Sequence, residues 1–95
     1  MPYPILSGQK TVTVAGTAEA LGTTQVDYAL LVRALDTNTG IVAVGNDGAD
    51  DVTLSNGYRL AAGEVCAFEH VDNLAAIFVD AEVSGEGVSW LKLDA

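Results

Sequence analysis

The chain has one cysteine, one histidine and four basic side chains in its 95 residues. Because an intramolecular disulfide needs two cysteines, the lone Cys66 excludes disulfide cross-links as a source of stability. The chain has thirteen acidic residues against these four basic ones, so its net charge is −9. Phosphate groups are bound by basic side chains, so the sequence predicts no nucleic-acid partner and no membrane partner.

Long apolar runs are also missing. No stretch approaches the roughly 18–20 residues that cross a bilayer, and the N-terminus lacks the basic start and apolar stretch of a secretory signal peptide. We therefore expect synthesis in the cytoplasm, with release inside a particle as an open route.

Hydrophobic residues nevertheless make up 49% of the chain. This content is too high for a disordered acidic tail, so the chain is expected to fold. A chain of this length buries only about 60–65% of the surface that it exposes when unfolded. We therefore expect oligomerisation, or docking on a larger body, to supplement its stability.

Proline occurs only at Pro2 and Pro4. Each proline fixes its own φ and pushes the preceding residue toward extended conformations. The sequence therefore predicts an extended N-terminal arm at residues 1–8, without strand partners, and a single β domain at residues 9–95.

The rest of the chain divides into short β-rich runs separated by glycine, asparagine and aspartate, a pattern typical of strands and turns. Asn56-Gly57 indicates a hairpin, because both residues accept positive φ. Helix is the rival interpretation for residues 26–35. Apolar side chains recur there at every second position, however, and this period favours a strand. The predicted strands are residues 11–14, 26–35, 41–44, 52–54, 58–60, 64–71, 76–81 and 88–93, with residues 19–21 as a short further candidate.

About seven or eight short strands without a convincing helix predict an all-β fold, a compact antiparallel sandwich or barrel. Trp90 has apolar neighbours in its run and is expected in the core, where its indole N–H would need an acceptor. The Gly85-x-Gly87 pair lacks the third glycine of a dinucleotide site and is expected to form a tight turn.

Reactive side chains are few, and the sequence predicts no enzyme, no catalytic residue and no cofactor. His70 has no nucleophile or orienting partner near it in sequence. Cys66 shares a predicted strand face with Phe68 and is expected to be a small core residue. Residues 46–51 crowd carboxylates in a glycine-bearing loop, but they lack the ligand spacing of an EF-hand. A solvated turn is favoured there, and cation binding is left open.

Five segments in order resemble a group of small tailed-phage virion proteins, over about residues 26–93. The segments are NTGIVAVG at residues 38–45, GYRLAAGE at 57–64, DNL at 72–74, IFVDA at 77–81 and GEGVSWL at 85–91.

This resemblance implies a head decoration (cement) protein at the capsid surface of a virion, where trimers bind the major capsid protein at local threefold positions. Other proteins with this outline are similar to tail or fibre parts. A tail, fibre or adhesin-like sugar-binding component is therefore the alternative, although aromatic side chains for stacking sugars are few.

The arm lies outside the resemblance. Its apolar side chains and its two prolines motivate a separate hypothesis, that it becomes ordered on the capsid. The expected capsid-binding residues are Pro2, Tyr3, Pro4, Ile5 and Leu6.

Overall fold

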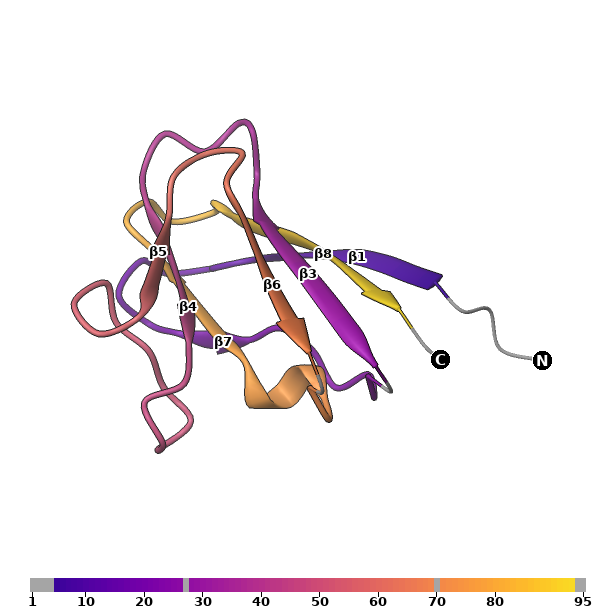
Figure 1. The fold of residues 1–95 in the computed structure, drawn as a ribbon. Coiled ribbons are helices and arrows are strands. Elements are labelled where there is room, and N and C mark those ends of the chain that lie inside the picture. The colour runs from indigo at the N-terminus through magenta and orange to yellow at the C-terminus, as the bar shows by residue number, and fades with distance from the viewer. Residues whose placement is uncertain (1–4, 27, 70, 94–95) are drawn as a thin grey trace.

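The computed structural model describes residues 5–26, 28–69 and 71–93. These residues form eight strands and one short 3-10 helix, η1, and Figure 1 shows their path. The elements are β1 (Ile5–Thr11), β2 (Glu19–Ala20), β3 (Ala29–Ala34), β4 (Val42–Gly45), β5 (Tyr58–Leu60), β6 (Val65–Glu69), η1 (Leu74–Ala76), β7 (Phe78–Ala81) and β8 (Gly87–Leu93).

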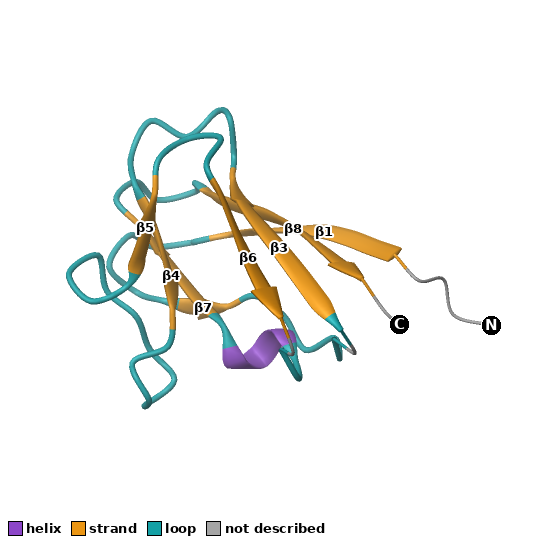
Figure 2. Ribbon diagram, viewed as in Figure 1, coloured by secondary structure: helices purple, strands orange, loops and turns teal. Residues whose placement is uncertain are grey.

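The strands form two four-stranded sheets, which face each other as the layers of a sandwich (Figure 2). One sheet has the order β1-β8-β3-β6 and the other the order β2-β7-β4-β5, and all neighbouring strands are antiparallel. The predicted all-β antiparallel fold is confirmed. Each sheet has two edge strands in the described chain, so the fold is the predicted sandwich and not the alternative barrel.

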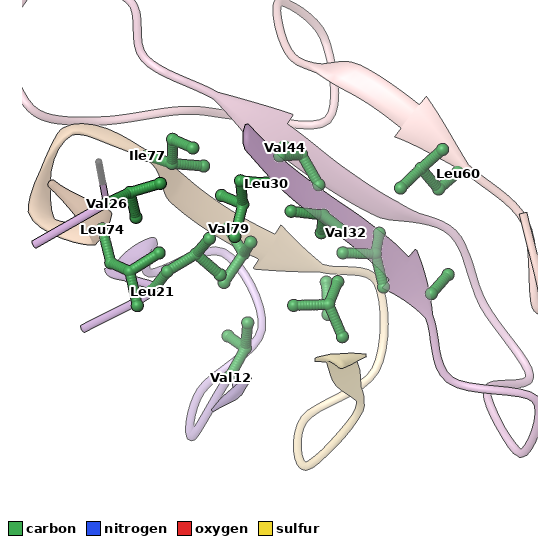
Figure 3. Packing of buried hydrophobic residues seen from close by; sticks show 14 residues of the cluster. Val12, Leu21, Val26, Leu30, Val32, Val44, Leu60, Leu74, Ile77 and Val79 are labelled. Carbon is green, nitrogen blue, oxygen red and sulfur yellow. The ribbon is translucent and has the colours of Figure 1, made fainter. Parts of the chain in front are cut away.

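The core lies between the sheets and explains why residues in the 26–35 run form a strand. In β3, Leu30, Val32 and Ala34 are fully buried, whereas Leu31 and Arg33 between them are exposed. This alternation has the period of a strand, so the helical interpretation was wrong. Figure 3 shows the cluster of fourteen buried hydrophobic side chains, to which both sheets and the connecting loops contribute.

The predicted arm needs a correction. Residues 5–8 are the first half of β1, where Ile5 pairs with Leu93 and Gly8 pairs with Trp90. The physical reason is that β8 has a free edge on that side, and its backbone N–H and C=O groups need partners. Pro2, Tyr3 and Pro4 lie outside the described residues.

The strand predicted at residues 11–14 is displaced for a related reason. β1 ends at Thr11, and the next residue, Val12, is fully buried in the core. Residues 13–17 then turn, with Thr17 N donating to Val14 O at 3.0 Å. The strand prediction for residues 12–14 was therefore wrong, because Val12 fills the core from a loop.

The first strand of the hairpin predicted around Asn56-Gly57 does not form, so that prediction was wrong. Residues 52–54 form no strand, and β5 pairs with β4 instead. A Cβ built on Gly57 would stand 2.5 Å from Val52 Cγ2 and 2.8 Å from Ala43 Cβ. Val52 is thus buried against the outer side of the β4 sheet, which prevents the chain before Gly57 from continuing as a paired strand.

Candidate functional site: an uncovered sheet face

The side chains that sequence analysis weighed for chemistry do not form a reactive centre in the described chain. Cys66 on β6 is half-buried against the core, and this burial raises the pKa of its thiol. His70 lies outside the described residues. Among residues 5–26, 28–69 and 71–93, no three histidine, cysteine or acidic side chains converge as metal ligands would.

Side-chain oxygens of the acidic loop at residues 46–51 accept hydrogen bonds from nearby backbone N–H groups. Asn46 Oδ1 accepts from Gly48 N at 2.8 Å, and Asp47 Oδ1 accepts from Ala49 N at 2.8 Å. Asp51 Oδ1 accepts from Val52 N at 2.8 Å. These contacts fix the loop in the form expected of a solvated turn.

The outer face of the β2-β7-β4-β5 sheet is covered in part by loops. Ala43 and Asp80 on that face are 0% and 3% exposed. Gly16 N donates to Asp80 Oδ1 at 2.9 Å, which ties the loop after β1 onto the sheet. The loop after β4 lies on the side of this sheet that points away from β1, β8, β3 and β6 (Figure 1).

None of the described loops covers the outer face of the other sheet in this way. Its residues form three rows across the four strands, and none of the twelve side chains is buried. We call these residues the uncovered face. The rows are Ile5, Leu93, Ala29 and Glu69; then Ser7, Leu91, Leu31 and Ala67; then Gln9, Ser89, Arg33 and Val65.

The uncovered face is apolar and nearly uncharged. Seven of its twelve residues are aliphatic, and Ile5 and Val65 are 54% and 53% exposed. Glu69 is its only carboxylate, and Arg33 is its only cation. Arg33 forms an ion pair with Asp36 at 2.8 Å. Apolar side chains gathered on one exposed sheet face make it a candidate interaction surface, because solvent contact with them is unfavourable.

A shallow groove of about 410 Å³ crosses this face. Its lining includes the small Ser7 and Ser89 together with Leu31, Arg33 and Val65. The small serine side chains leave room that a protruding apolar side chain of a partner can fill.

The structure places only part of the predicted capsid-binding segment on this face. Ile5 and Leu6 are 54% and 46% exposed, but neighbouring residues of a strand point to opposite faces. Ile5 belongs to the uncovered face, whereas Leu6 is in the same row as Lys92 and the buried Leu30, on the opposite side of the sheet.

Trp90 lies on the inner side of the same sheet and packs against the core, as predicted. Its indole Nε1 is buried without a hydrogen-bond partner among the described residues, so the expected acceptor is not found there.

The uncovered face was not predicted from the sequence, although a signal for it exists. Leu91 and Leu93 alternate with Trp90 and Lys92, and Leu31 faces outward from a run whose other face is also apolar. A strand with two apolar faces in a small sandwich indicates that the second face also meets something.

No protein-family model, no curated protein and no solved structure matches this chain. Within the described residues, no helix is both long enough and apolar enough to cross a bilayer.

Proposed function

We propose that the chain is a structural protein of a tailed-phage particle, a decoration (cement) protein that binds the major capsid protein and stabilises the head shell. The observation that carries the proposal is the uncovered face, an exposed and largely apolar sheet face in a chain with a net charge of −9. The resemblance of five ordered segments to small virion proteins supports the phage assignment and the capsid surface as its location.

The start of β1 supports Pro2–Leu6 as the capsid-binding segment. β1 pairs with β8 on one side, and no described strand pairs with its other edge. A strand added to that edge gains main-chain hydrogen bonds. The added strand also lies beside Ile5 and Leu6, which project from opposite faces of β1. A flat partner surface does not reach both of these side chains together.

Occupancy on head shells stripped of the protein tests this function. The full-length chain is added to stripped shells, and the bound amount is measured by electron cryo-microscopy and gel densitometry. We expect Leu6→Ser and Ile5→Ser to lower occupancy several-fold. Val14→Ser is the matched control, because Val14 is also an exposed aliphatic residue, 56% exposed, outside β1. Occupancy that both β1 variants leave unchanged would contradict the binding segment, and a chain located only in tails would contradict the head assignment.

One observation favours the alternative, a sugar-binding tail or fibre component. Tyr58 on β5 is 65% exposed and borders a groove between β5 and β6, with Phe68 and Val44 in its walls. An exposed aromatic ring beside an apolar groove is suited to stacking on a sugar ring. A glycan array separates the two functions. A reproducible hit that Tyr58→Ala abolishes, and that Tyr28→Ala at another exposed tyrosine retains, would favour the alternative.

A further inference from the structure

We propose that the groove between β5 and β6 receives a strand of a partner protein, which extends the β1-β8-β3-β6 sheet by pairing with β6. The partner strand runs antiparallel to β6, is apolar on both of its faces and is basic at its N-terminal end. This site is separate from the β1 segment of the proposed function, and the inference does not depend on that function.

The groove opens where the edges of the two sheets part. The turn at residues 61–64 joins the edge strands β5 and β6 at one end, and the two strands diverge toward the other end (Figure 1). The groove has a volume of about 570 Å³, and Val44, Tyr58, Cys66 and Phe68 are among the residues that line it. None of its lining residues is charged, so the groove suits apolar side chains.

The backbone hydrogen bonds of β3 alternate between its two neighbouring strands. Ala34 N donates to Glu64 O at 2.9 Å, toward the β6 side. The next residue, Leu35, donates from its N–H to Gly87 O at 3.1 Å, toward the β8 side. Because this alternation continues along an antiparallel ladder, the even-numbered residues of β3 bond to β6 and its odd-numbered residues bond to β8.

The same alternation gives the outer edge of β6 free backbone groups. Leu31 is opposite Ala67 on β6 and opposite Leu91 on β8, and as an odd-numbered residue it bonds to Leu91. The N–H and C=O of Ala67, and likewise those of Val65, therefore point away from β3. No described strand lies on that side of β6. An added strand gains main-chain hydrogen bonds to these groups.

A strand added to β6 also contacts two apolar surfaces at once. Its inward side chains continue the row of Cys66 and Phe68 and point into the groove, whereas its outward side chains continue the uncovered face beside Val65 and Ala67. A sugar ring or a flat surface meets only one of the two. The edge strands β5 and β2 have three and two residues, whereas β6 has five, enough to pair with a strand.

Charge defines the direction of the partner strand. At the open end of the groove, Glu69 follows Phe68, and Asp47 lies in the loop after β4. At the closed end, the Glu64 carboxylate accepts from Ala61 N at 2.7 Å, which holds it in the turn. The strand pairs of this sheet are antiparallel, and a partner strand of the same kind begins beside Glu69. A basic residue at its first position therefore lies near carboxylates.

A peptide array tests this sequence preference. The wild-type full-length chain is added to immobilised hexapeptides that begin with lysine or glutamate. Their other five positions are drawn from valine, isoleucine, phenylalanine, tyrosine and threonine. We expect binding to a subset of the lysine peptides, and at least about five-fold weaker binding to their glutamate counterparts. An array on which nothing binds, or on which the glutamate peptides bind equally well, would overturn the inference.

Ala67→Pro tests the backbone pairing. Proline at this position removes an N–H that points away from β3, so the pairing of β6 with β3 is expected to persist. We expect the affinity for the best lysine peptide, measured by isothermal titration calorimetry, to fall at least about 10-fold, because a carbonyl of the peptide loses its donor. Ala67→Ser is the matched control, since it keeps the N–H and should bind like the wild type. Binding that survives Ala67→Pro would count against strand addition.

N-methylated peptides repeat this test on the wild-type chain, whose fold is not altered. Successive amides of a strand point to opposite sides, so only one alternate set faces β6. We expect methyl groups on one set of amides to abolish binding and methyl groups on the other set to preserve it. Equal effects of the two sets would exclude a paired strand.

Cys66 reports whether the peptide lies in the groove. It is the only cysteine of the chain, and it lines the groove. A saturating peptide should slow the reaction of its thiol with N-ethylmaleimide at least about five-fold, because the reagent needs access to the sulfur. An unchanged rate would place the peptide elsewhere on the molecule and overturn the assignment of the site.

Discussion

The indole of Trp90 on β8 lies directly against the backbone of Gly8, its cross-strand partner on β1. A Cβ built on Gly8 would stand 2.5 Å from Cζ2 and 2.8 Å from Cε2 of the ring. Because Gly8 has no side chain, the ring of Trp90, the largest side chain of the sheet, can pack against its backbone. This pair also links the edge strand β1 to the core, because Trp90 packs against the buried cluster.

Gly8→Ala is therefore expected to destabilise the fold by about 1–3 kcal/mol, the usual cost of forcing extra volume into a packed site. Urea unfolding followed by tryptophan fluorescence measures the change. Gly22→Ala is the control, since a Cβ there meets its nearest neighbour, Leu74 Cδ1, at an ordinary 3.5 Å. Equal stability losses in the two variants would show that the contact with Trp90 is not the cause.

Glu19 gives the stability a dependence on pH. The hydrogen bond from Lys10 Nζ at 2.9 Å, followed by that from Thr13 N at 2.7 Å, lowers the pKa of the Glu19 carboxyl from 4.5 to about 2. Because the folded pKa lies below the unfolded one, this stabilisation is fully present above about pH 4.5. It is lost as the pH falls toward about 2.

Glu19→Gln is expected to lower the free energy of unfolding by about 1 kcal/mol at pH 7, as for a partly exposed ion pair. The difference from the wild type should shrink as the pH falls from 4.5 toward 2. Urea titrations at several pH values measure this convergence. Lys10→Met removes the first hydrogen bond and should reproduce most of the effect. A constant difference across that range would rule out the carboxyl as its source.

The predictability of the structure differed between strands and loops. Period-two alternation identified β3 correctly, because Leu30, Val32 and Ala34 must share one buried face. The same rule failed at Val12 and Val52, which look like strand residues but are buried from loops. Local alternation does not show which sheet edge is free, so the pairing of Ile5 with Leu93 could not be predicted either. The residues that make up the uncovered face follow from that pairing. The other sheet lacks a similar face among the described residues because loops lie on it.

Asn38 shows how a loop is fixed by a buried amide. Its Nδ2 donates to Gly87 O at 2.8 Å, and its Oδ1 accepts from Gly87 N at 3.3 Å. Asn38→Ala removes the partner of Gly87 N, whereas Gly87 O keeps the hydrogen bond from Leu35 N at 3.1 Å, so we expect a loss of about 1–2 kcal/mol. Thermal unfolding measures it. Thr37→Ala, at the exposed neighbouring position, should change the stability little, and equal losses in the two variants would argue against the amide.

Truncation at the N-terminus separates binding from folding. Deleting residues 2–8 removes the cross-strand pairs from Ile5–Leu93 to Gly8–Trp90. It also uncovers the β8 backbone and the Trp90 ring, so we expect a clear fall in the melting temperature. Deleting residues 2–4 leaves every described pair of β1 in place, so it should change the melting temperature little. Differential scanning calorimetry compares the two. Low shell occupancy of the shorter deletion at unchanged melting temperature would then report on binding alone, whereas equal melting temperatures for both deletions would mean that the first half of β1 contributes nothing to the fold.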